Sequence, residues 1–158
     1  MRRHSTAGFT LIELMILVII IVILGTLVAM TYSGIQSKNR NAERQASIKT
    51  LQSELEIYYA QTSKYPTLAN VNDPTWRAQN VKDLDESDLK DPSWHKATKV
   101  CTAKNEPVIS ATPSKECYSY QVTTADGSPC DNTNADCAQY TLTAILEGGE
   151  KFVKSSLN

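Results

Sequence analysis

The chain has 158 residues, of which 41% are hydrophobic and 21% are charged, an ordinary globular composition. Its 16 Lys and Arg residues nearly balance 17 Asp and Glu residues, which gives a formal net charge of −1. These values exclude a collagen-like repeat, low-complexity disorder and a dense disulfide scaffold, and they do not indicate a strongly basic nucleic-acid surface.

The first thirty residues join a short basic segment, residues 1–8, to a long apolar one, residues 9–30. As a helix rising about 1.5 Å per residue, the apolar segment would reach about 33 Å, enough to cross a bilayer core. Its only charged residue is Glu13. The segment is too long for the apolar region of a cleaved secretory signal. It fits a single-pass anchor with the later residues outside the cytoplasm, in which Glu13 either lies at the interface or has a partner on another chain.

The junction of these two segments reads Gly8-Phe9-Thr10-Leu11-Ile12-Glu13-Leu14. A small residue, then Phe, then Glu four residues after the Phe resembles the class III signal peptides of type IV pilins and pseudopilins. The resemblance implies that a prepilin peptidase cleaves between Gly8 and Phe9 and methylates the new amino group of Phe9. It also implies that Glu13 pairs with the amino terminus of a neighbouring subunit during assembly.

Residues 31–62 are predicted to continue the same helix, for a total of about 50 residues and about 75 Å. An apolar stripe at spacings of three and four predicts packing against a sheet of the same chain; it comprises Ile48, Leu51, Leu55, Tyr58 and Thr62. The charged residues are assigned largely to the other faces: Lys38, Arg40, Glu43, Arg44, Lys49, Glu54 and Glu56. Local unwinding at Gly25 and Gly34 is one possibility, and a continuous helix is the other.

The helix is expected to end before Pro66, because Tyr65 is pushed towards an extended conformation by the following proline. Residues 63–116 then form a loop-rich connecting region, in which Asn80 is expected to cap a short helix that runs to about Leu89. Five acidic residues are interpreted as a solvated surface rather than a metal site: Asp83, Asp85, Glu86, Asp88 and Asp91.

Residues 117–158 are predicted to form a β-sheet. Alternation of apolar and polar residues indicates strands over 117–123, 138–146 and 151–155, with a turn at Gly148-Gly149. The predicted fold class is α+β: a long N-terminal helix packed on a small three-stranded antiparallel sheet, as the pilin resemblance also implies. The predicted organisation is a leader at 1–8, an anchor at 9–30, an amphipathic helix at 31–62 and a globular head at 63–158.

Four cysteines, Cys101, Cys117, Cys130 and Cys137, all lie in the part expected outside the cytoplasm, where disulfides form. Short loops favour the pairs Cys101–Cys117 and Cys130–Cys137, although four cysteines allow three connectivities. A zinc site is disfavoured because no Cys-x2-Cys pair is present. Calcium near the last loop is a minor alternative to ordinary turns; the candidate ligands are Asp126, Asp131, Asn132, Asn134 and Asp136.

No enzyme is predicted, because His4 lies in the leader, His95 stands alone, and the phosphate-binding and hydrolase motifs are absent from the sequence. No cofactor is predicted either. The resemblance implies a type IV pilus subunit that moves from the cytoplasmic membrane into a surface filament for adhesion, twitching motility or DNA uptake. Its implied partners are copies of itself, a prepilin peptidase, an assembly platform protein and an ATPase motor, and nucleic-acid binding by this subunit alone is not indicated.

Two other functions stay open from the sequence. One is a pseudopilin of a type II secretion or competence machine. The other is a monomeric, membrane-anchored extracellular binding domain, for which Glu13 would have no role in assembly.

Overall fold

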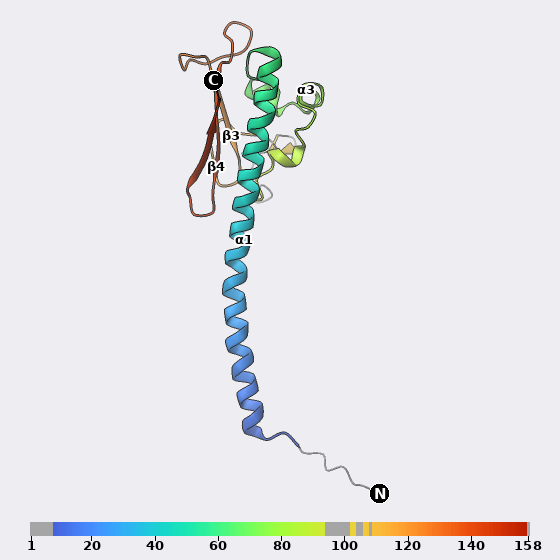
Figure 1. Ribbon diagram of the computed structural model, residues 1–158, viewed down its shortest axis with the longest axis vertical. Coiled ribbons are helices and arrows are strands. Elements are labelled where there is room, and N and C mark those ends of the chain that lie inside the picture. Colours follow the sequence, from blue (N-terminus) through green and yellow to red (C-terminus); the bar gives the residue numbers. More distant parts are fainter. Residues whose placement is uncertain (1–7, 94–101, 104–105, 108, 158) are drawn as a thin grey trace. The chain divides into compact units, whose positions relative to one another are not determined.

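The computed structural model describes residues 8–93, 102–103, 106–107 and 109–157. The chain divides into two compact units, Met1–Lys38 and Asn39–Asn158. One long helix, α1 (Leu11–Thr62), begins in the first unit and ends in the second (Figure 1).

The first unit consists, in its described residues, of a short non-helical segment and the first part of α1. Its apolar window Leu11–Val28 has the length and composition of a membrane-spanning helix, and none of it is buried within the protein. The predicted long apolar helix is therefore confirmed. Gly25 and Gly34 both lie within continuous helix. Local unwinding at these glycines stays a prediction.

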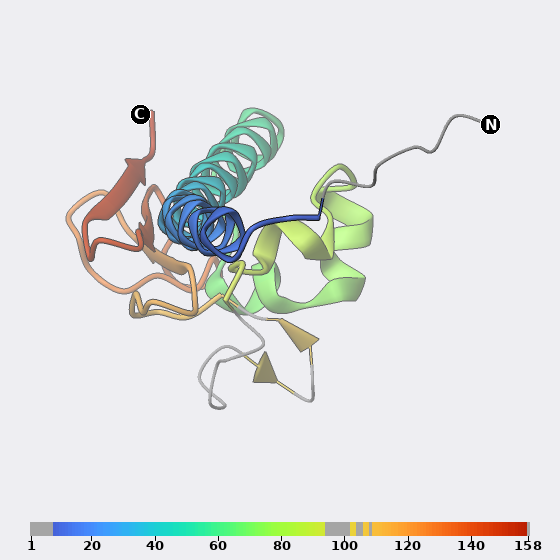
Figure 2. The same cartoon turned by 90° about the horizontal axis from the view of Figure 1, so that it is seen from below.

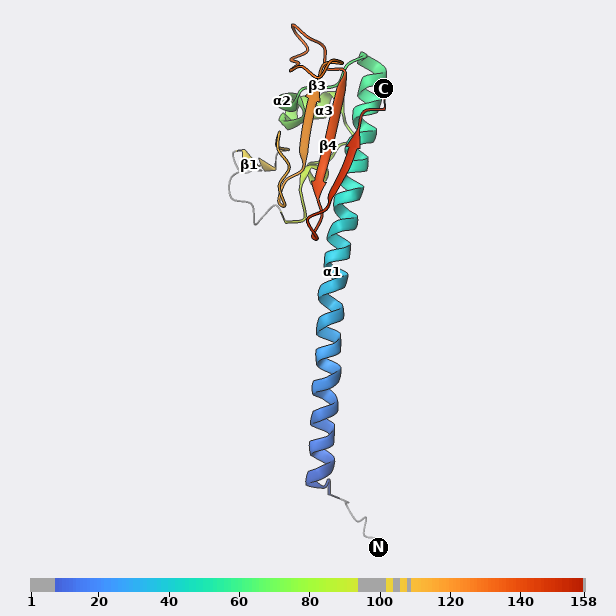
Figure 3. The same ribbon diagram turned by 90° about the vertical axis from the view of Figure 1, so that its left-hand side faces the viewer.

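The second unit contains the sheet. Strands β3 (Ser119–Thr123), β4 (Gln139–Ile145) and β5 (Lys151–Ser155) pair antiparallel in the order β3-β4-β5 (Figure 3). The hairpin between β4 and β5 turns at Gly149, whose φ of 88° is readily adopted only by glycine. The predicted three-stranded antiparallel sheet is confirmed.

The core of the second unit lies between the sheet and α1. Ile48, Leu51 and Leu55 of the predicted stripe are buried in one cluster with Tyr120 and Leu142 of the sheet. Burial of each aliphatic side chain stabilises the fold by about 1.5–3 kcal/mol. The sheet covers one flank of this part of α1, and the short helices of the connecting region lie on the other (Figure 2).

The connecting region contains α2 (Leu68–Asn72), α3 (Pro74–Asn80), the 3-10 helix η1 (Glu86–Leu89) and two short paired strands, β1 (Thr102–Ala103) and β2 (Glu106–Pro107). The Asp73 carboxylate caps α3, which has Pro74 as its first residue. Asn80 therefore ends a helix instead of starting one, and the prediction for this residue was wrong. The Asp-Pro sequence starts the helix seven residues earlier than expected because proline is favoured in a first turn.

A buried ion pair joins α1 to the segment after η1. Arg44 and Asp91 are only 2% and 1% exposed, and the guanidinium binds the carboxylate through two bonds of 2.7 and 3.0 Å. Arg44 also donates to Ser93 at 3.1 Å and to Glu147, just beyond β4, at 2.9 Å. The interpretation of Asp91 as part of a solvated surface was therefore wrong, and so was the assignment of Arg44 to a helix face away from the apolar stripe.

The electrostatics of this cluster follow from its geometry. Burial opposes the charge on Arg44, but hydrogen bonds to Asp91 and Glu147 outweigh that cost and raise the pKa of the guanidinium. Glu147 also accepts a hydrogen bond from Arg40 at 2.6 Å. The two arginines lower the pKa of Glu147 to about 2. Arg44 and Glu147 thus stay charged over the ordinary pH range. The cluster ties three chain segments together.

Candidate functional site

The segment that carries the leader motif lies at the start of α1. Gly8, Phe9 and Thr10 are exposed and non-helical, and α1 begins directly after them at Leu11. No described atom comes within 4 Å of the position that a Cβ on Gly8 would occupy. The Gly8–Phe9 peptide bond therefore lies in an exposed, non-helical segment and is open to approach.

Glu13 lies in the first turn of α1 and interacts with Thr10. The Thr10 N–H donates to the Glu13 carboxylate at 3.4 Å, and the Glu13 N–H donates to the Thr10 hydroxyl at 3.3 Å. This reciprocal arrangement is a capping box, which satisfies backbone donors that have no partner within the helix. Sequence reasoning sought a cationic partner and missed this role, although the Thr-x-x-Glu spacing indicates it. Pairing of Glu13 with another subunit stays a prediction.

A disulfide joins Cys130 and Cys137, the pair favoured from the sequence. Asn132, between them, donates from its side chain to the Tyr65 carbonyl at 2.7 Å and accepts from the Cys137 N–H at 2.8 Å. The disulfide loop is thereby fixed to the segment that leaves α1. Cys117 is buried, but its predicted partner, Cys101, lies outside the described residues, so that pairing stays a prediction.

Two of the calcium candidates, Asp126 and Asp131, accept hydrogen bonds from donors in their own loops. Asp131 accepts the N–H groups of Thr133, Asn134 and Ala135, which hold the pKa of its carboxyl well below the usual range. Asp126 accepts from the Thr124 hydroxyl and the Ser128 N–H. In the part of the chain that the structure describes, no three His, Cys, Asp or Glu side chains are arranged to hold a metal ion. The arrangement is that of hydrogen-bonded turns.

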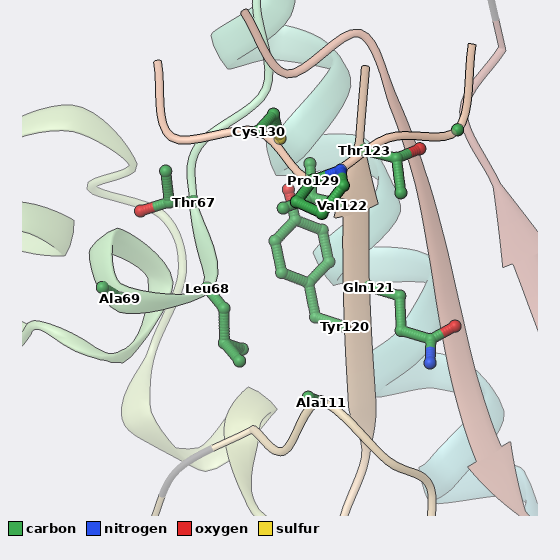
Figure 4. Close-up of a pocket in the computed structure, with 11 residues that line it drawn as sticks. Thr67, Leu68, Ala69, Ala111, Tyr120, Gln121, Val122, Thr123, Pro129 and Cys130 are labelled. Carbon is green, nitrogen blue, oxygen red and sulfur yellow. The ribbon is translucent and has the colours of Figure 1, made fainter. Parts of the chain in front are cut away.

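A hollow of about 580 Å³ lies between α2 and β3 (Figure 4). Thr67, Leu68 and Ala69 line one side, β3 lines another, and Pro129 and Cys130 close the end. Tyr120 is its only titratable side chain apart from the disulfide-bonded Cys130. The Tyr120 hydroxyl donates to the Pro66 carbonyl at 2.7 Å, and burial raises the pKa of the phenol. The described residues that line this hollow therefore do not include the paired acid and base groups that proton-transfer chemistry requires.

The two histidines weighed in the sequence, His4 and His95, lie outside the described residues. Among the described residues, the features that bear on function are the exposed Gly8–Phe9 segment, the capped apolar helix and the disulfide-bonded head.

Comparison with known proteins identifies similar chains in type II secretion systems. The chain is 39% identical over 67 residues to a type II secretion system core protein G of Klebsiella michiganensis, a match that covers 42% of this chain and 47% of the relative. It is 32% identical over 80 residues to the protein of the same name from Aeromonas hydrophila, covering 48% of this chain and 56% of the relative. A third, from Dickeya chrysanthemi, is 35% identical over 60 residues, which are 38% of this chain and 39% of that protein.

The chain spans about half the length of the curated relatives it matches. No family model matches it, and no solved structure does. The relatives are pseudopilins, and a long N-terminal apolar helix together with a three-stranded antiparallel sheet is an α+β arrangement consistent with a pilin-like fold. The resemblance to the pilin and pseudopilin family, predicted from the motif at Gly8–Leu14, is thereby confirmed.

Proposed function

We propose that this chain is a pseudopilin, a filament-forming structural subunit of a type II secretion machine. The observation that carries the proposal is the similarity to three proteins named type II secretion system core protein G. A function as a type IV pilus subunit, which the sequence favoured, has weaker support because these relatives are named as secretion-system proteins. The alternative of a monomeric anchored domain gives the Gly8–Glu13 motif no function.

In the proposed sequence of events, the apolar part of α1 first holds the precursor in the cytoplasmic membrane with the second unit outside. A prepilin peptidase then cleaves the exposed Gly8–Phe9 bond and methylates Phe9. The helix afterwards exchanges lipid for the helices of neighbouring copies, driven by an ATPase through a platform protein. A filament at the periplasm or cell surface results.

Two properties of the described residues support this sequence of events. The Leu11–Val28 window is exposed along its whole length, so it requires either lipid or other helices around it. The capping box holds the Glu13 carboxylate at the helix N-terminus, where it accepts from the Thr10 N–H. A positive amino group from a second copy would then meet a carboxylate that is already in place.

The first experiment is intact-mass analysis of the full chain expressed with a prepilin peptidase. The proposal expects a chain that begins at N-methyl-Phe9 and is recovered from sheared filaments. A chain that retains Met1 and stays in the membrane fraction would instead establish an anchored monomer.

Variants at Glu13 separate its charge from its capping role. Gln at the same position can still complete a capping box but has no charge. The proposal expects both Glu13→Ala and Glu13→Gln to lose filament assembly, measured as the sheared fraction. Full assembly by Glu13→Gln would show that capping alone matters. Glu43→Ala is the matched control, because it removes an exposed carboxylate from the second unit's part of the same helix.

A further inference from the structure

The apolar surface of α1 continues beyond the segment that is long and apolar enough to span a bilayer. That segment is Leu11–Val28, and α1 is unbroken past it (Figure 1). Tyr32 and Ile35 follow on the next two turns and are 62% and 50% exposed. Together with Leu27 and Val28 they line a hollow of about 310 Å³, which lies entirely within the first unit.

This continuation lies on one side of the helix. At about 100° per residue, Val28, Tyr32 and Ile35 fall within about 60° of one another around the helix axis. Ser37 lies about 140–180° around the axis from these three residues. Beyond Val28, the helix therefore carries its apolar surface on the Tyr32–Ile35 side alone.

The apolar surface is too long for a helix that stands upright in a bilayer. From Leu11 to Ile35 the helix rises about 36 Å at 1.5 Å per residue, whereas a bilayer core is about 30 Å thick. A helix whose apolar length exceeds the core thickness tilts, and residues that anchor it at the interface set the direction of the tilt. The one-sided surface beyond Val28 therefore predicts a tilt that turns this side towards the bilayer.

Tyr32 and Lys38 match the chemistry of the interfacial layer. Tyrosine combines an apolar ring with a polar hydroxyl, and tyrosines are enriched at the level of the lipid headgroups. Lys38 is exposed and lies about 60° around the axis from Ile35. Its methylene chain can cover apolar surface while its ammonium reaches a lipid phosphate. Because the surface is continuous with Leu11–Val28, the bilayer that holds this segment is the surface best placed to cover it.

We propose that the Tyr32–Ile35 side of α1, together with Lys38, lies in the phospholipid headgroup layer of the outer leaflet. This inference rests on the proposed membrane-anchored precursor and adds the direction in which its helix tilts. Tyr32 and Ile35 leave the lipid together with the spanning segment when the subunit enters a filament.

The test is NMR of the isotope-labelled, uncleaved full chain, reconstituted at one copy per phospholipid nanodisc. A gadolinium chelate in the water and a nitroxide lipid labelled next to its headgroup broaden the signals of the groups that they approach. We expect chelate broadening of the backbone amides beyond Val28 to vary with a period of about 3.6 residues, with minima at Tyr32 and Ile35. The nitroxide lipid should broaden the same two amides more than their neighbours.

Three outcomes would overturn the inference, and they separate it from the proposed function. If the Leu11–Val28 amides are protected but chelate broadening rises smoothly after Val28, the anchor stands and the inference alone is wrong. If the Leu11–Val28 amides are exposed to the chelate, the anchored precursor is wrong and the inference fails with it. If periodic protection appears only when two copies share a disc, a second helix covers this side instead of lipid.

A double variant assigns the effect to the two side chains. Tyr32→Ser combined with Ile35→Ser should abolish the periodic pattern after Val28 and leave the protection of Leu11–Val28 unchanged. Ser37→Ala changes the opposite side of the helix and should keep the wild-type pattern. Wild-type amide shifts in the second unit would establish that each variant is folded. An unchanged periodic pattern in the double variant would overturn the proposal.

Discussion

Replacement of Arg44 by Met tests the buried ion pair that joins α1 to the segment after η1. In the variant, Asp91 would stay 1% exposed and would keep, among the described contacts, only the Ser93 N–H at 2.8 Å. Removal of one partner from a buried pair leaves an uncompensated charge, which costs about 3–5 kcal/mol. We expect this loss in the free energy of unfolding of the second unit.

The assay is urea unfolding of the full chain in neutral micelles, followed by tryptophan fluorescence. Trp76 contributes to the signal from α3, where its ring lies 5.1 Å from that of Tyr58. With a slope of about 1–3 kcal/mol per molar urea, the Arg44→Met variant should unfold at least about 1 M earlier. Arg40→Met is the control, because Arg40 is one third exposed and binds the partly exposed Glu147; its effect should be much smaller.

A double variant tests whether the cost comes from the orphaned carboxylate. Arg44→Met combined with Asp91→Asn removes both charges, so it should recover part of the stability that Arg44→Met loses. The reasoning is wrong if Arg44→Met stays within about 1 kcal/mol of the wild type, or if the double variant is less stable than the single one.

Three further predictions concern the second unit. The pKa of Glu147 is lowered from 4.5 to about 2 in the folded state, so the stabilisation by this carboxylate is complete above pH 4.5 and is lost as pH falls towards 2. In thermal melts, the melting temperature of Glu147→Gln should therefore depend less on pH over this range than that of the wild type. An equal pH dependence in the two proteins would contradict this prediction. Ser63 has a φ of 60° directly after α1, so Ser63→Gly should raise stability by about 1 kcal/mol in urea unfolding, whereas Ser63→Ala should not. The buried Tyr118 hydroxyl has no hydrogen-bond partner among the described residues, so Tyr118→Phe should unfold at no lower urea concentration than the wild type. Tyr140→Phe loses a 2.7 Å hydrogen bond to Glu56, so it should lower the free energy of unfolding by about 1 kcal/mol.

Local patterns were sufficient to predict the main elements of the fold. The stripe at Ile48, Leu51 and Leu55 is a periodicity within one helix, and the strand alternation around Tyr140 and Leu142 needs no information from elsewhere in the chain. The Thr10–Glu13 capping box was equally local and could have been identified from its spacing.

The buried ion pair could not be predicted in the same way. Arg44 is four residues before Ile48 and thus continues the apolar stripe, a position at which a charge requires a buried partner. That partner is Asp91, which lies 47 residues away in the sequence. Asp91 belongs to a run of acidic residues, and nothing in the sequence distinguishes it from the others. Charge type alone suggested solvent exposure, and the pairing depends on tertiary contacts.

The attachment of Tyr65 to the disulfide loop affects how the head opens locally. The Tyr65 N–H donates to the Cys137 carbonyl at 2.8 Å, and its carbonyl accepts from Asn132. Fraying at the end of α1 must therefore break bonds to a loop whose ends are covalently joined. We therefore expect the helix exit and the loop to open as one cooperative unit, so that amide protons of both segments exchange with solvent together. Reduction of the Cys130–Cys137 disulfide would consequently accelerate exchange at a helix terminus more than sixty residues earlier in the chain.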